Sequence, residues 1–166
     1  MDAVRRALLW LFWAEATLAV SAFLVVAVSL MSDVIGREFF GDGIFGAQRV
    51  AVWATAIAGL GGFALVTAQG GHLRPQFADK WLPASWEPVV LRVADLISAS
   101  ICLALAWFAW DFVMENRRLE ERGMAIPILV WPIQLILPWM FASSALRYLV
   151  FAAFPPLRPE QKSGLG

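Results

Sequence analysis

The chain has few of the residues that build redox, metal or haem sites. Its 166 residues include one cysteine, Cys102, and one histidine, His72. A lone cysteine has no partner within the chain, so disulfide frameworks, cysteine zinc sites and redox dithiols are excluded, and we expect a buried thiol. Membrane cytochromes commonly need paired histidines as haem ligands, so that class is excluded too. We predict no cofactor, no metal ion and no enzymatic activity.

Charged residues are also scarce, at 16% of the chain, whereas 60% of the residues are apolar. Lysine plus arginine equals aspartate plus glutamate at 13 each, so no excess charge points to nucleic acid. A phosphate-binding Gly-Lys-Ser/Thr motif is missing, which excludes an ATPase. The composition predicts a single membrane domain over residues 1–166.

Four long apolar runs define the expected fold, because a membrane-spanning helix needs about 20 mostly apolar residues. We predict an all-α integral membrane protein with four transmembrane helices, at about 7–31, 47–69, 88–114 and 125–153. Leu73, Phe77 and Trp81 recur every fourth residue, which predicts a short interfacial amphipathic helix at about 74–82, between the second and third spans. We expect a surface loop over residues 32–46 and a kink at Pro138 in the last span.

Glu15 and Asp95 are two acidic residues inside the predicted spans. Glu15 lies about 12 Å into the first helix. A carboxylate at this depth could take part in proton coupling or bind a partner subunit. Alternatively, it pairs with a neighbouring helix of the same chain or lies close enough to the interface to remain hydrated. Asp95 follows Arg92 by three residues, so we expect these two side chains to pair. His72, Arg74 and Lys80 are expected in the interface, next to lipid.

Small residues form rows along the second span. Ala54, Ala58 and Gly62 are four apart, and Ala51, Thr55 and Gly59 form a parallel row. Such rows let another helix approach closely, which is a main source of helix association in lipid. The alternative is that alanine and glycine are simply common in membrane helices. If the rows do mediate close packing, the second span packs against a partner.

Charge gathers instead in the predicted connections. Residues 115–123 carry both signs and are either a solvated connector or a docking surface for a soluble partner, where charge sets orientation. Four spans put both termini on one side of the membrane. Six basic residues on that side, against four on the other, favour cytoplasmic termini.

Several short motifs, in order, give the chain a family resemblance. They are Asp33-Val34-Ile35-Gly36-Arg37, Arg49 with Trp53, Gly71-His72-Leu73-Arg74, Leu82-Pro83, Ala125-Ile126-Pro127 and Leu137-Pro138. In these the chain resembles the small membrane subunit of tripartite ATP-independent periplasmic (TRAP) transporters, the DctQ-like family. It departs from the family at Phe45-Gly46-Ala47, where two glutamates are common, and at Trp139 or Met140, where a glycine is usual.

The resemblance implies two partners besides membrane lipids. One is a large multi-span membrane subunit that holds the substrate and sodium sites, and the other is a periplasmic substrate-binding protein that delivers an organic acid. The small subunit would be a fixed scaffold in a bacterial or archaeal inner membrane. We expect contacts with the large subunit at Glu15, Arg49, Ala54, Ala58, Gly62, Asp95 and Pro138. We expect docking of the binding protein at Arg37, Arg117, Arg118, Glu120, Glu121 and Arg122.

Two alternatives stay open at this point. One is a stand-alone proton-coupled exporter similar to the small multidrug resistance family, with Glu15 as its coupling residue. The other is an unrelated membrane assembly factor.

Overall fold

The computed structural model describes residues 2–70, 87–123 and 126–159, and within these ranges the regular structure is helical. The elements are α1 (Asp2–Phe40), α2 (Ala47–Ala68), α3 (Glu87–Arg118), α4 (Trp131–Gln134), α5 (Ile136–Ala153) and the 3₁₀ turn η3 (Pro155–Leu157). Four stretches are long and apolar enough to cross a membrane: Asp2–Phe40, Ala47–Ala68, Val89–Arg118 and Trp131–Ala153. The all-α class and the four predicted spans are therefore confirmed. The interfacial helix expected at 74–82, with His72, Arg74 and Lys80, lies outside the described residues.

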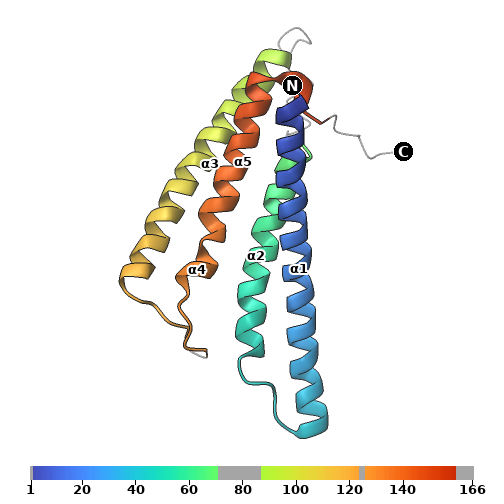
Figure 1. Ribbon diagram of the computed structural model, residues 1–166, viewed down its shortest axis with the longest axis vertical. Helices are drawn as coiled ribbons and strands as arrows, with labels where there is room; N and C mark the ends of the chain where they lie inside the picture. The colour runs from blue at the N-terminus through green and yellow to red at the C-terminus, as the bar shows by residue number, and fades with distance from the viewer. Residues whose placement is uncertain (1, 71–86, 124–125, 160–166) are drawn as a thin grey trace, which may run out of the picture.

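The helices form two antiparallel pairs, α1 with α2 and α3 with α5, and α2 packs on α5 to join them (Figure 1). The start of α1, the end of α2 and η3 lie at one end of the bundle, which we call the terminus end. The connections from α1 to α2 and from α3 to α4 lie at the other end, which we call the loop end (Figure 1).

The two outer helices, α1 and α3, bury only a narrow stripe each. The inward positions recur alternately every four and three residues, the spacing of two helices packed along one seam. In α1 they are Glu15, Ala19, Ala22, Val26, Ser29, Asp33 and Gly36, and in α3 they are Asp95, Ala99, Cys102, Ala106, Ala109, Val113 and Asn116. Nearly all are small or polar, which allows close approach of the backbones in lipid. The expected burial of Cys102 is confirmed.

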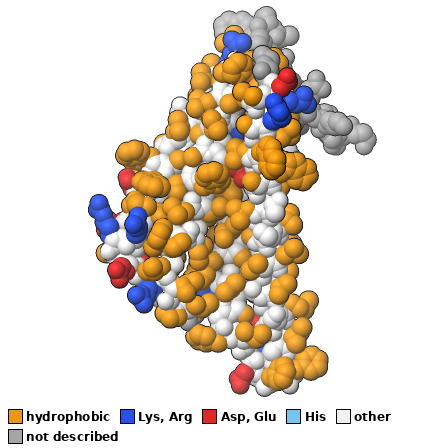
Figure 2. All heavy atoms as spheres, in the orientation of Figure 1, with side chains coloured by type: hydrophobic (Ala, Val, Ile, Leu, Met, Phe, Trp, Pro, Cys, Tyr) orange, Lys and Arg blue, Asp and Glu red, His pale blue; other side chains and the backbone are white. Residues whose placement is uncertain are grey.

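Large apolar side chains point outward from these same helices. Phe23, Leu24 and Val28 of α1 are mostly exposed, and so are Trp107 and Phe108 of α3. Hydrophobic side chains cover most of the face drawn in Figure 2, and charged ones gather toward the ends of the bundle. Such a surface suits acyl chains or another membrane protein, because a soluble protein buries these residues.

Helices α1 and α2 approach each other closely at Gly61. A Cβ added to Gly61 would lie 2.7 Å from Ala19 Cβ and 3.3 Å from Ala19 Cα. Glycine is thus required at residue 61 for the backbones to sit this close. By contrast, α5 is the central helix, since it touches α2, α3 and η3 and buries side chains on several sides.

The loop expected over residues 32–46 is wrong in its first part, because α1 continues to Phe40. The seam persists through Asp33 and Gly36, and an ion pair between Asp33 and Arg37 one turn apart supports the last turns. The helix then ends at Gly41, whose φ of 80° suits glycine after a helix C-terminus.

The last two spans also differ from expectation at the loop end. Helix α3 runs to Arg118, because Asn116 is one more seam position and donates a hydrogen bond to Gln134 Oε1 at 2.8 Å. The last span is broken at Leu135, between α4 and α5. Pro138 lacks an N–H, and its ring crowds the carbonyl of Gln134 four residues earlier, so the expected kink falls one turn upstream of the proline.

Candidate functional site

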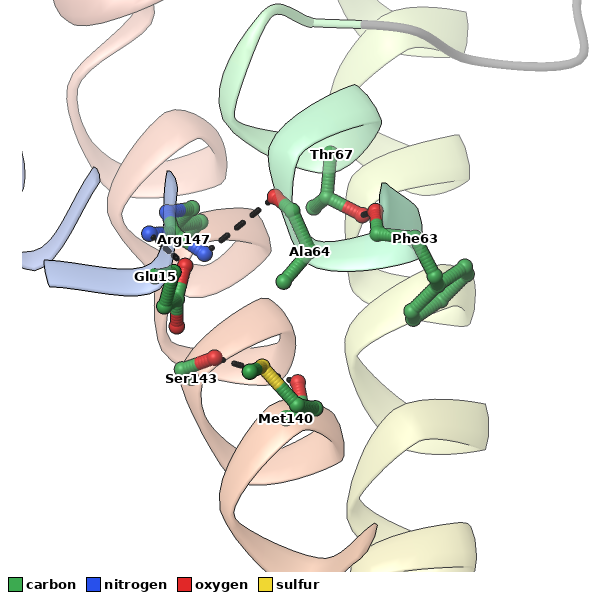
Figure 3. A network of polar contacts seen from close by, with 7 residues as sticks. All are labelled: Glu15, Phe63, Ala64, Thr67, Met140, Ser143 and Arg147. Atoms are coloured by element: carbon green, nitrogen blue, oxygen red, sulfur yellow. Dashed lines mark hydrogen bonds and ion pairs between the residues drawn. The ribbon is translucent and has the colours of Figure 1, made fainter. Parts of the chain in front are cut away.

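A buried ion pair joins three helices near the terminus end. Glu15 Oε2 of α1 accepts a hydrogen bond from Arg147 Nη2 of α5 at 2.5 Å, and each side chain is only 1% exposed. Arg147 Nη1 also donates to the backbone carbonyl of Ala64 in α2 at 3.3 Å. Figure 3 shows the guanidinium between the carboxylate and this carbonyl. One arginine therefore connects α1, α2 and α5.

This arrangement favours one of the readings of Glu15. A single charge inside a membrane is costly, whereas a hydrogen-bonded pair of opposite charges compensates much of that cost. The structure supports the reading of a carboxylate paired with a neighbouring helix. Sequence reasoning missed Arg147, although the signal was present: it is the only charge in the last apolar run, and it lies near the same end as Glu15.

A second ion pair at this end fastens the C-terminal segment. Asp95 of α3 is buried and accepts a hydrogen bond from Arg158, which follows η3. The expected pairing of Asp95 with Arg92 is wrong, because Arg92 is exposed and Asp95 faces the seam with α5. The segment after α5 folds back over the bundle and brings Arg158 to Asp95, a contact between residues too distant in the chain for local spacing to indicate.

The loop end has a more open polar cluster. Asp33 accepts hydrogen bonds from Arg37 and from Gln48 Nε2, the latter at 3.2 Å. With Arg49 these residues line a cavity of about 460 Å³ between the end of α1 and the start of α2. The Arg37 side chain is 54% exposed. Motif residues that are separate in the sequence thus meet at one place.

The connection from α3 to α4 completes this end. The Arg117 guanidinium lies 5.1 Å from the centre of the Trp131 ring, and Arg118 Nη1 is 3.8 Å from Glu115 Oε2. Arg118, Glu120, Glu121 and Arg122 are all exposed.

The two loops are in contact with each other. A Cβ added to Gly46 would lie 2.9 Å from Ile126 Cδ1, and one added to Gly123 would lie 2.9 Å from Trp53 Cζ2. The two connections that carry or flank the six candidate docking residues therefore lie side by side at the loop end. We call residues 33–49 and 117–123 together the loop-end surface.

The candidates for packing against a partner are divided by the structure. Ala54 and Pro138 are buried within the subunit, as are Glu15 and Asp95. Arg49, Ala58 and Gly62 are half-buried. A Cβ added to Gly62 would meet nothing within 4 Å, so this side of α2 is open. Within the described ranges, no three or more His, Cys, Asp or Glu side chains gather where they could hold a metal ion.

The comparison with protein families decides what kind of subunit this is. A family model described as tripartite ATP-independent periplasmic transporters, DctQ component, matches residues 26–153. The chain belongs to this family. It is similar to the ectoine TRAP transporter small permease protein TeaB of Halomonas elongata, with 25% identity over 144 residues, which cover 83% of this chain and 72% of TeaB. No solved structure matches the chain.

As a DctQ-family member, the chain is a small permease subunit and a multi-pass protein of the inner membrane. Membership implies association with a large membrane subunit and a substrate-binding protein. Asp33, Arg37, Arg49 and Trp53 lie within the matched residues, so the whole loop-end cluster belongs to the family region. Glu15 lies before it, whereas its partner Arg147 lies inside.

Proposed function

We propose that this chain is a non-catalytic scaffold subunit of a sodium-coupled TRAP transporter that takes up an organic acid. In this role it anchors the large elevator subunit in the membrane, and it helps to dock the periplasmic substrate-binding protein. Substrate and sodium sites belong to the large subunit. The transported organic acid follows from the family resemblance, whereas the relative TeaB is named for ectoine.

One observation carries the scaffold role: α1 and α3 each bury a narrow seam and present large apolar side chains on the rest of their surface. Each of these helices packs mainly on one neighbour within the chain. Most of their circumference is therefore available to a large membrane partner and to lipid, while the buried carboxylates of Glu15 and Asp95 are paired inside.

The loop-end surface is the proposed docking region for the substrate-binding protein. Its exposed arginines and glutamates carry both signs, and complementary charge would orient an approaching soluble partner and raise the encounter rate. This proposal places the loop end in the periplasm and both termini in the cytoplasm.

The alternative of a proton-coupled exporter is disfavoured by the contacts of Glu15. An exporter needs its carboxylate to gain and lose a proton in contact with both sides of the membrane. Here the carboxylate is 1% exposed and is held by the subunit's own Arg147. The position of this carboxylate suits a role in holding the helices together better than a role in exchanging protons with water.

The experiment is a pull-down of the large subunit through a tagged small subunit. Gly62→Leu adds a side chain on an open face of α2, where nothing lies within 4 Å of the new Cβ. We expect it to reduce the yield of co-purified large subunit, with Gly62→Ala intermediate and the thermal unfolding of the small subunit unchanged. An undiminished yield with Gly62→Leu would exclude this face of α2 from the interface.

A further inference from the structure

A groove at the terminus end lies outside the contacts described so far. It is bounded by the first turns of α1, the end of α2, the last turns of α5 and the segment that follows. Its volume is about 730 Å³, within the range of small-molecule and cofactor sites. Its wall includes Arg5, Leu8 and Phe12 of α1, Arg147 and Phe151 of α5, and Arg158 after η3.

The charged lining of this groove is entirely basic. Arg5, Arg147 and Arg158 contribute to its wall, and none of the described residues that line it is acidic. The carboxylates that pair with Arg147 and Arg158, those of Glu15 and Asp95, are not part of the wall. They hold the two guanidiniums in place, and Arg147 also donates to the carbonyl of Ala64.

Arg5 supplies the charge that is not compensated. It is exposed, and no ion pair to it occurs among the described residues. Arg147 and Arg158 each have a buried carboxylate partner, so among the described lining residues Arg5 is the one whose charge no described carboxylate pairs. The positive charge of Arg5 matches the single negative charge of a phosphodiester headgroup, and arginine is well suited to bind phosphate oxygens with two parallel hydrogen bonds.

The depth of the groove fits the boundary between headgroups and acyl chains. Trp10 and Trp13 of α1 are 78% and 65% exposed, and exposed tryptophans of membrane helices favour the interface. Arg5 lies about 8 Å further along the helix toward the terminus end. Leu8, Phe12 and Phe151 line the wall on the membrane side of Arg5.

We propose that this groove binds an anionic phospholipid of the surrounding bilayer. The phosphate accepts hydrogen bonds from Arg5. One acyl chain lies along Leu8, Phe12 and Phe151. Basic pockets between membrane helices are typical sites for anionic headgroups. The apolar wall favours a lipid over free phosphate, because inorganic phosphate has no apolar part to bury against it. The proposed lipid site does not depend on the proposed transport role.

The test compares two neighbouring arginines. Arg5 lines the groove, whereas Arg6 is also exposed and is not among the residues that line it. The full-length subunit would be purified in detergent and titrated with phosphatidylglycerol or phosphatidylethanolamine, and bound lipid would be counted by native mass spectrometry. We expect phosphatidylglycerol to bind more tightly than phosphatidylethanolamine. Arg5→Gln should weaken it about fivefold, the factor for one arginine near an anionic headgroup, and Arg6→Gln should not.

Three results would overturn the proposal. Equal binding of the two lipids would show that charge does not select the occupant. Equal losses in Arg5→Gln and Arg6→Gln would indicate diffuse attraction to a basic surface. Displacement of phosphatidylglycerol by millimolar inorganic phosphate would identify a site for free phosphate. Because Arg5 is exposed, Arg5→Gln leaves the buried ion pairs intact, and an unchanged unfolding temperature checks this.

Discussion

The two ends of the bundle use the same chemical pairing in different surroundings. At the terminus end, Glu15 of α1 meets Arg147 of α5, each 1% exposed, and the pair spans the interior. At the loop end, Asp33 and Arg37 belong to one helix, and the arginine side chain is 54% exposed. The carboxylate is therefore buried in both pairs, whereas the arginine sits inside the bundle in one case and largely in water in the other.

The difference assigns the two ends different tasks. A buried pair between helices is strongly destabilising when one partner is removed, because a charge remains without compensation. A pair within one helix, partly in water, contributes little to stability and leaves the arginine available to other molecules. The terminus end holds the subunit together, and the loop end presents charge to a partner.

The largest effect is expected for Arg147→Met, which leaves the Glu15 carboxylate buried and unpaired. We expect a loss of about 3–5 kcal/mol in the free energy of unfolding, measured by denaturant titration in detergent. The double variant Glu15→Gln with Arg147→Met should recover most of this loss, because no lone charge remains. If the double variant were as unstable as the sum of its single variants, the pair would not be the reason for the loss.

The next effect concerns the helix approach beside that pair. Gly61→Leu places a side chain where a Cβ alone would already be 2.7 Å from Ala19 Cβ. We expect it to destabilise the subunit by about 1–3 kcal/mol, as overpacking does. Gly62→Leu, one residue along on the open side, should stay within about 0.5 kcal/mol. Equal losses at the two positions, by the same titration, would contradict the assignment of inner and outer faces.

A smaller effect is expected from the pair at the loop end. Asp33→Asn should cost about 1 kcal/mol or less. The loss should shrink as salt is raised from low to about 1 M, because water reaches Arg37 and ions screen the pair. The loss in Arg147→Met should barely change over the same range. A salt dependence shared by both variants would remove the distinction between the two ends.

The smallest effect on stability is expected for Arg118→Glu, since this side chain is 82% exposed. Unfolding should shift by less than about 0.5 kcal/mol. Uptake by the complete transporter should nevertheless fall several-fold when the substrate-binding protein is limiting, and recover when it is in excess. Arg118 is a cleaner probe than Arg117, whose guanidinium packs on Trp131. Unchanged uptake at limiting binding protein would remove Arg118 from the docking surface.

Much of the fold could be predicted from the sequence, because length and hydropathy are local properties that a bilayer constrains strongly. The four spans and the burial of Cys102 are of this kind. The end of α1 was missed because Asp33 and Arg37 suggest a loop when taken alone. Asp33 is in fact an inward position of α1, and Arg37 is its ion-pair partner. Gly41 was the residue that could have indicated where the helix ends.

The partners of the buried charges could not be predicted in the same way. Glu15 and Arg147 lie 132 positions apart. Asp95 pairs with Arg158 and not with the nearby Arg92, because the C-terminal segment folds back over the bundle. Such pairings depend on which helices become neighbours. The split between Gly61 and Gly62 has the same origin, since both are small and only the position of α1 distinguishes them.

The central claim is that this subunit supports transport without performing it. Its most direct test is solute accumulation in vesicles that contain the purified small subunit alone, compared with vesicles that also contain the large subunit, with an inward sodium gradient and loaded substrate-binding protein in both. We expect accumulation only when both membrane subunits are present. Accumulation against a gradient by the small subunit alone would contradict the account.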